Sequence, residues 1–301
     1  MPTLPAPLLI ALSTLLFATM GVCVKLASVH YGTGEIVFYR GLTGALMIAL
    51  VARRRGGSLR TPVPGMHLWR SIAGVTALCL WFYSIGGLPL ATAVTLNYMS
   101  SVWMALFLIG GAIAMGRSRV DGRLFAAVLT GFAGVVLILR PTVEQEQLWH
   151  GVMGLLSGMI SAVAYLQIAA LGRVGEPEYR TVFYFSLGGM AAGAGLMAIN
   201  GMQPHTVGGA LLLLAVGLLA TTAQLLMTRA YATGTPLVNA SLQYLGIVFS
   251  FVYGMLLFDD PVTWMALAGM ALIVGAGLAA TLLRSRAQLP VHNPATPSTE
   301  S

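Results

Sequence analysis

Ten apolar segments of about 20 residues each dominate the chain and leave only short stretches between them. A helix needs about 20 mostly apolar residues to cross the hydrocarbon core of a bilayer. The segments lie at about 7–28, 34–52, 68–87, 90–114, 122–139, 151–171, 179–198, 208–230, 236–258 and 262–283. Most breaks between them fall at charged clusters or at Gly and Pro, which end helices for steric reasons. The sequence therefore predicts an all-α integral membrane protein with ten transmembrane helices.

The low charge of the chain argues against a soluble fold. Charged residues make up 8% of the 301 residues, whereas soluble domains are about 25% charged. Lys and Arg accumulate in the cytoplasmic loops of membrane proteins. With ten spans and a cytoplasmic N-terminus, that side receives the basic residues at 53–55, 60, 70, 117, 119, 123, 173, 180, 229, 284 and 286. This asymmetry explains the net charge of +7 without a nucleic-acid partner, and it predicts that both termini are cytoplasmic.

The two halves of the sequence resemble each other. Val37-Phe38-Tyr39-Arg40 resembles Val182-Phe183-Tyr184-Phe185, and Thr95-Leu96-Asn97-Tyr98 resembles Ser241-Leu242-Gln243-Tyr244, at an offset of about 145 residues. Each copy holds five helices, an odd number, so the second copy must enter the membrane upside down. Inverted repeats of this kind enclose a substrate site near mid-membrane in transporters. We expect repeats at residues 1–145 and 146–287 around a central cavity, followed by a disordered cytoplasmic tail at 288–301.

The chain lacks the usual signatures of enzymes and of metal or cofactor sites. It has no phosphate-binding glycine loop, which argues against ATP-driven transport. Its two cysteines lie in apolar segments, and its five histidines are scattered singly and are predicted to lie in loops or in the tail. No nucleophile, base and acid cluster at one depth. We therefore expect no catalytic residues, no metal and no cofactor.

The sequence resembles the EamA-type branch of the drug/metabolite transporter superfamily. The resemblance rests on the ten segments, on Glu35 to Arg40, on Gly-rich fifth and tenth segments, and on the junction from Trp81-Phe82-Tyr83 into Leu88-Pro89-Leu90. Met115-Gly116-Arg117-Ser118 stands where many members carry an acidic residue at the end of the fourth helix. Among subfamilies the chain is most similar to YddG-type amino-acid exporters. The resemblance implies export from the cytoplasm across the bacterial inner membrane.

Amides and hydroxyls at mid-depth are candidates for substrate contacts. Asn97 and Ser101 share one helix face, and Gln243 is the repeat equivalent of Asn97. Tyr165 and Gln224 lie on polar stripes of the sixth and eighth segments. Polar groups are costly in lipid, so they should face a cavity or another helix. Hydrogen bonding between helices is the alternative, which we favour for any single Ser or Thr.

Aromatic residues at similar depth complete the candidate site, because aromatic faces hold ammonium groups and apolar side chains. They are Trp81, Tyr83, Tyr98, Trp103, Tyr165 and Tyr244. Lys25, Arg40 and Glu35 lie nearer the non-cytoplasmic face and are predicted either to form a charged outer rim or simply to snorkel and pair with one another.

These features predict an exporter of amino acids, aromatic and other neutral ones, with broad specificity and alternating access. The near absence of mid-membrane carboxylates favours facilitated movement without proton coupling. The partners expected are amino-acid substrates and membrane lipids, with a monomer as the working state. Efflux of drugs or other metabolites is the alternative within transport. An intramembrane enzyme or a structural membrane protein are alternatives from other classes.

Overall fold

The computed structural model describes residues 5–114, 122–139, 145–233, 239, 242–260 and 262–287, and in this part of the chain every regular element is a helix. The expected tail at 288–301 lies outside the described residues. The helices are α1 (Ala6–Ala27), α2 (Thr33–Arg54), α3 (Pro64–Gly87), α4 (Leu90–Tyr98), α5 (Ser100–Ala114), α6 (Gly122–Leu139), α7 (Gln145–Arg173), α8 (Glu178–Asn200), α9 (Val207–Thr233), α11 (Leu245–Phe258) and α12 (Trp264–Ala287).

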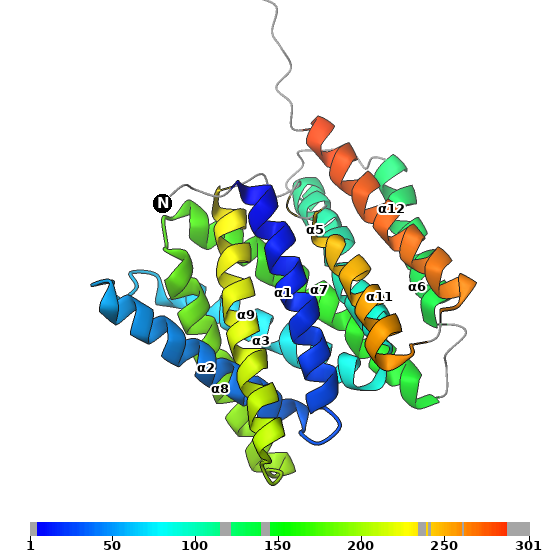
Figure 1. Ribbon diagram of the computed structural model, residues 1–301. Helices are drawn as coiled ribbons and strands as arrows, with labels where there is room; N and C mark the ends of the chain where they lie inside the picture. The colour runs from blue at the N-terminus through cyan, green and yellow to red at the C-terminus, as the bar shows by residue number, and fades with distance from the viewer. Residues whose placement is uncertain are drawn as a thin grey trace, which may run out of the picture.

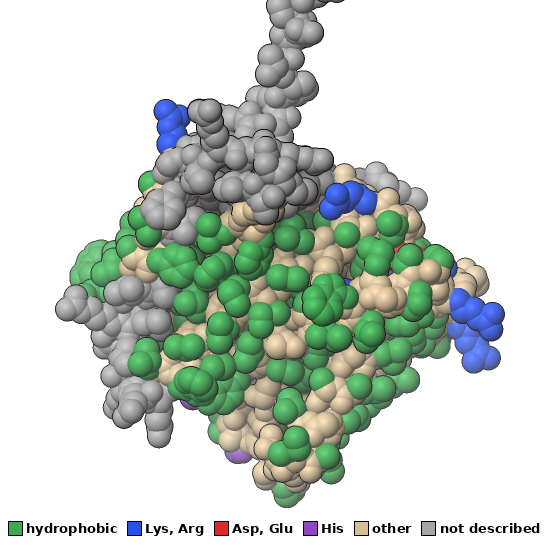
Figure 2. Space-filling view, turned by 180° about the vertical axis from the view of Figure 1, so that it is seen from behind, with side chains coloured by type: hydrophobic (Ala, Val, Ile, Leu, Met, Phe, Trp, Pro, Cys, Tyr) green, Lys and Arg blue, Asp and Glu red, His purple; other side chains and the backbone are tan. Residues whose placement is uncertain are grey.

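Six of the described helices are long and apolar enough to cross a membrane: α1, α2, α3, α7, α8 and α9. Large apolar side chains such as Leu46, Ile199 and Leu256 are exposed on the molecule. Figure 2 shows hydrophobic side chains spread over the face it presents, with Lys and Arg at its margins. A surface of this kind is stable only with lipid as its solvent, so the protein is a multi-pass membrane protein.

Helices from the first half of the chain pack against helices from the second half. Helix α1 lies beside α9, α2 crosses α8, α3 packs on α7, and α6 pairs with α12 (Figure 1). Helix α4 contacts both α7 and α11. The two halves therefore form one interleaved bundle, in which the interior is bounded by helices from both.

Glycines allow the closest of these crossings. A Cβ atom on Gly193 of α8 would overlap the backbone of Phe38 in α2, and one on Gly41 would overlap the backbone of α8 at Met190. A Cβ atom on Gly158 of α7 would lie 2.7 Å from the carbonyl oxygen of Leu96 in α4. In lipid no hydrophobic drive brings helices together, so close backbone contact at small residues contributes much of the association.

The segment at 90–114, expected as one helix, is broken at Met99 into α4 and α5. The Met99 N–H donates to the Leu96 carbonyl, and the Val102 N–H donates to the Met99 carbonyl. Both hydrogen bonds join residues three apart, as in a 3₁₀ turn. Ser100, directly after the break, is fully buried. A break of this kind is tolerated at membrane depth where protein covers the freed backbone groups.

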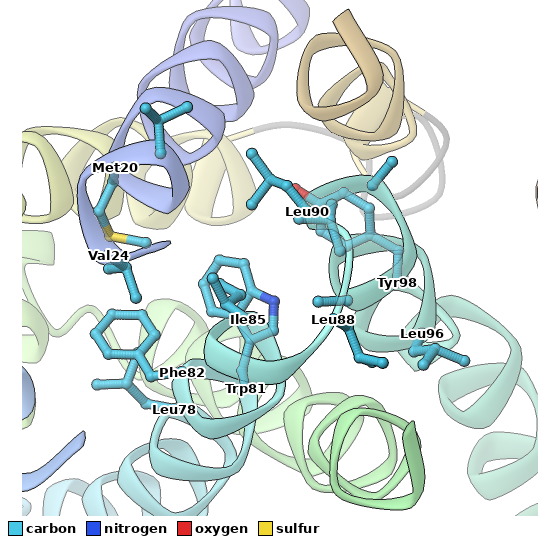
Figure 3. Close-up of a cluster of buried hydrophobic side chains, with 14 of the residues drawn as sticks. Met20, Val24, Leu78, Trp81, Phe82, Ile85, Leu88, Leu90, Leu96 and Tyr98 are labelled. Carbon is cyan, nitrogen blue, oxygen red and sulfur yellow. The ribbon is translucent and has the colours of Figure 1, made fainter. Parts of the chain in front are cut away.

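A large apolar cluster fills the space between α1, α3 and α4. It includes Met20, Val24, Phe82, Ile85 and Leu90, all nearly inaccessible to solvent. Figure 3 shows these side chains converging between the three helices, with Trp81 and Tyr98 at the same cluster. The cluster lies toward the C-terminal ends of α1 and α3, so it closes that end of the bundle interior.

We predict that Gly193→Ala destabilises the protein while Gly195→Ala on the same helix does not. The added methyl group at Gly193 meets the backbone of α2, which cannot move aside, whereas a Cβ atom on Gly195 meets nothing within 4 Å. Overpacking of this kind costs about 1–3 kcal/mol. Thermal unfolding of both variants in detergent, followed by tryptophan fluorescence, measures the difference. Equal melting temperatures for Gly193→Ala and the wild type would contradict the crossing described here.

Candidate functional site

A cavity of about 60 Å³ lies within the bundle and is lined by α1, α2, α3, α4, α7, α8 and α9, together with Gln243. Ligand pockets in proteins usually measure about 300–1,000 Å³. In this conformation the cavity therefore has room for a few water molecules and is too small for a solute. Its walls are nevertheless rich in polar groups, which makes it the candidate functional site.

Three amide side chains contribute to the cavity wall: Asn97 of α4, Gln224 of α9, and Gln243. The Asn97 amide donates to the hydroxyl oxygen of Ser157, at 2.9 Å, and to that of Ser161, at 3.3 Å, both on α7. This contact is possible because α7 passes the backbone of α4 closely at Gly158. The Gln243 amide has a weaker partner, the sulfur of Met227, at 3.7 Å. Asn97 is thus held in place, while Gln243 retains donor and acceptor capacity for a ligand.

Aromatic side chains form much of the remaining wall. Trp81 of α3, Tyr98 of α4 and Tyr165 of α7 all line the cavity. Tyr165 stacks on Tyr231 with a ring separation of 5.9 Å. The indole nitrogen of Trp81 is buried and finds no hydrogen-bond partner among the described residues. The wall therefore offers aromatic faces, and one of its aromatic residues carries a buried N–H without a partner in the described part of the chain.

Two arginines line the same cavity. Arg40 of α2 is 4% exposed and Arg70 of α3 is 3% exposed. Both guanidinium groups contact the ring of Phe185 on α8, at 5.0 Å from Arg40 and 4.2 Å from Arg70. Sequence reasoning placed Arg40 near an outer rim, but the structure places it in the cavity wall. It also placed Arg70 among the cytoplasmic loop charges, and the structure places it inside the bundle.

The other predicted residues lie elsewhere. Tyr83 is 38% exposed and stacks on His150, and it is not in the cavity wall. Trp103 packs against Phe107 and Phe132. Ser101 and Tyr244 are buried but are also absent from the lining.

The other two charges predicted for an outer rim form local contacts. Lys25 pairs with Asp260 at 2.8 Å, and Asp260 also accepts a hydrogen bond from the Leu90 N–H. Glu35 does not pair with Arg40 in the structure. Its carboxylate accepts hydrogen bonds from the backbone N–H groups of Gly32 and Gln203. These contacts fix loops at the N-terminus of α2 and the C-terminus of α11, away from the cavity.

Several wall residues were not predicted from the sequence. Ser13, Thr14 and Phe17 of α1 line the cavity, as does Phe185. The hydroxyls of Ser13 and Thr14 bond to carbonyls of their own helix. Their polar character within an apolar segment was an available signal, but a hydroxyl that bonds to a carbonyl of its own helix needs no cavity, so the signal did not indicate one.

A buried polar cluster lies one helical turn from Arg70. His67 of α3, predicted to lie in a loop, is 1% exposed, and its Nε2 lies 3.1 Å from a carboxylate oxygen of Glu176. Arg180 lies 3.5 Å from the other carboxylate oxygen. Burial raises the pKa of Glu176, but hydrogen bonds from Thr61 and His67 and the charge of Arg180 lower it more, so the pKa stays below its ordinary value. The cluster ties the start of α3 to the loop between α7 and α8.

The residues that the structure describes contain no group of three His, Cys, Asp or Glu side chains placed to hold a metal ion. The chemistry of the wall is instead that of binding: two cations, three amides and several aromatic faces. Membrane-length helices around such a cavity have the architecture of a small-solute transporter.

Comparison with known proteins identifies the family. The chain belongs to the EamA-like transporter family, whose model matches residues 4–140. It is 32% identical to the pseudopaline exporter CntI of Pseudomonas aeruginosa over 272 residues, covering 90% of this chain and 94% of that protein. It is 28% identical to a riboflavin transporter of Rhizobium johnstonii, covering 89% of this chain and 86% of that protein. A solved crystal structure shares the fold with a TM-score of 0.66 at 21% identity, covering 94% of this chain and 98% of that one.

We predict that Glu176→Gln lowers the stability of the protein at neutral pH, by about 1–3 kcal/mol, because the charged partner of His67 and Arg180 is lost. Since the folded-state pKa of Glu176 is depressed, its stabilising contribution is present above the ordinary Glu pKa and is lost as the pH falls through the folded-state value. The gap between the wild type and the variant should therefore close in acid. Melting temperatures from pH 7 down to about pH 3, a range that passes below the ordinary Glu pKa, measure it, with Glu178→Gln as the control. A pH-independent gap would contradict this account.

Proposed function

We propose that the protein exports amino acids and related small metabolites that carry a carboxylate from the cytoplasm across the bacterial inner membrane. The observation that carries this proposal is the cavity wall, which joins two guanidinium groups, neither of them ion-paired within the described residues, to amides and aromatic faces. A guanidinium matches a carboxylate in shape and charge. Amides serve an amine or hydroxyl, and aromatic rings serve an apolar or aromatic side group.

Efflux of other metabolites is the second candidate function. It is favoured by the named activities of the relatives, which are export of pseudopaline and transport of riboflavin. The two candidates share the family and the cavity, and they differ only in which solutes the cavity accepts. A transport assay with a panel of amino acids and other metabolites distinguishes the two candidates.

We further propose that the ten apolar segments form two inverted five-helix repeats, at 1–145 and 146–287. Helix packing supports this arrangement, because exchanging the repeats turns the contact of α1 with α9 into that of α7 with α3, and both contacts are extensive. The break at Met99 before α5 and the start of α11 after Tyr244 are also about one repeat apart. Arg40 and Phe185, at equivalent positions, contact each other, as expected of residues near a shared two-fold axis.

The size of the cavity supports transport by alternating access. With a volume of about 60 Å³, the site has to widen before a solute can enter it. The basic loop after α2 and the junction of α7 with α8, where Arg173 and Arg180 lie, are assigned to the cytoplasmic side, together with both termini, by the preference of Lys and Arg for that side. The apolar cluster around Phe82 then closes the outer end of the path.

Coupling to protons is not part of the proposal. Among the described residues that line the cavity there is no Asp or Glu, the groups that proton-coupled carriers often use as relays. Movement down the gradient of the solute is sufficient. A pH indicator inside proteoliposomes tests this point, since acidification or alkalinisation that depends on the solute would contradict it.

We predict that proteoliposomes containing the protein take up labelled Phe, Thr or Met faster than vesicles without it. Gln224→Ala should lower the uptake severalfold, because Gln224 lies in the cavity wall. Thr222→Ala is the matched control on α9, since the Thr222 hydroxyl bonds to the Leu218 carbonyl of its own helix and Thr222 is not in the wall. Absence of uptake for all three amino acids would exclude amino-acid export and leave the metabolite candidate.

A further inference from the structure

We propose that Arg40 and Arg70 together form a binding site for two carboxylates of one solute, so that the preferred substrates are organic dicarboxylates with an apolar or aromatic part. This inference rests on the proposed function, because it names the substrate class of the same cavity. The two residues are called the arginine pair below.

Among the residues with a described position, the arginine pair has no counter-charge of its own. Within the described part of the chain, neither guanidinium group forms an ion pair. The Nε atoms of both arginines and one terminal nitrogen of Arg70 are buried without a hydrogen-bond partner there. The carboxylates of Glu35, Glu176 and Asp260 are held by other partners. Among the described residues, two positive charges are therefore buried together, and these three donor nitrogens are without a partner.

Burial of an unpaired charge is costly, and two like charges at one ring repel each other. The face of Phe185 offsets part of this cost by cation–π attraction to both guanidinium groups. The remaining imbalance is removed by a ligand that supplies two negative charges. A solute with a single carboxylate would leave one guanidinium uncompensated.

The direction of Arg70 supports a binding role. Arg70 lies in the second turn of α3, so its side chain could reach the water beyond the nearby N-terminal end of the helix. Long basic side chains near a helix end usually take that path. The guanidinium instead reaches along the helix toward Gly74, where a Cβ atom would overlap it. Because Gly74 has no side chain, the guanidinium of Arg70 can occupy this space in the cavity wall.

The surroundings favour an organic dicarboxylate over a compact phosphate. Trp81, Tyr165 and the amide of Gln243 line the same small cavity, and they provide contacts for a carbon skeleton between or beside the two acidic groups. A phosphate monoester also carries two negative charges, but on one centre. The experiment therefore includes a phosphate probe of similar size.

The test compares binding of phenylsuccinate and 3-phenylpropionate, which differ by one carboxylate, to the full-length protein in detergent by titration calorimetry. We expect phenylsuccinate to bind at least about tenfold more tightly, because a hydrogen bond to a charged group changes a dissociation constant by about this factor. In Arg40→Gln and in Arg70→Gln the ratio should fall toward one. Arg53→Gln, at an exposed residue at the end of α2, is the control and should leave the ratio unchanged.

Gly74→Ala is the variant that keeps both charges. The added methyl group displaces the far end of a flexible side chain, so the protein should fold while the guanidinium of Arg70 leaves its place. The preference for phenylsuccinate should be reduced as in Arg70→Gln. An unchanged preference in Gly74→Ala and Arg70→Gln would overturn the proposal.

Other outcomes separate this inference from the proposed function. Equal affinity for the two probes in the wild type, or tighter binding of phenyl phosphate than of phenylsuccinate, would overturn the arginine pair as a dicarboxylate site even if amino acids are transported. A tenfold preference for phenylsuccinate in a protein that transports no amino acid would support the arginine pair and exclude amino-acid export.

Discussion

Close contact between helix backbones in lipid is the constraint on which the rest of the structure depends. Apolar side chains gain little by leaving lipid for one another, so the bundle is held where glycines let backbones meet, as at Gly193 against Phe38 and Gly158 against Leu96. The contact at Gly158 also brings Ser157 and Ser161 of α7 within hydrogen-bond distance of Asn97. Packing of the backbone therefore determines which polar groups reach the cavity wall.

The cavity contains two buried positive charges, whose burial is unfavourable for folding, and a ring contact that offsets part of this cost. In the part of the chain that the structure describes, Arg40 and Arg70 are surrounded by aromatic and amide groups instead of carboxylates, and Phe185 contacts both. Carboxylates occur outside the cavity wall, where Asp260 holds Lys25 and Glu176 holds His67. Negative charge is thus used to fix loops and helix ends, and the centre of the bundle is left positive. On this basis we propose that the site prefers anionic groups.

The segment pattern predicted the helical class, because the cost of unsatisfied backbone groups in lipid leaves few alternatives. The equivalence of Asn97 and Gln243 similarly indicated two residues that do lie in the cavity wall. It was harder to predict which side chains of each helix point into the cavity. Trp81 and Tyr83 are two residues apart and so lie on nearly opposite sides of α3, which means that one cavity could not include both. Ser101 and Trp103 follow the break at Met99, where the face of the helix changes. Arg70 was missed because its position near a segment end fitted a loop charge, and its direction depends on the space at Gly74.

The crossing of α2 and α8 has a mechanical consequence. Gly41 and Gly193 place main-chain atoms of the two helices in direct contact, and a main chain has no rotamers with which to adjust. Sliding one helix along the other would bring Cα atoms against carbonyl oxygens, so we expect the two helices to move together as one rigid unit. Adaptable surfaces are found where long thioethers such as Met20 and Met227 fill the interior, because such side chains can repack at small cost. We therefore expect any widening of the cavity to take place where these methionines pack, while the pair formed by α2 and α8 keeps its shape.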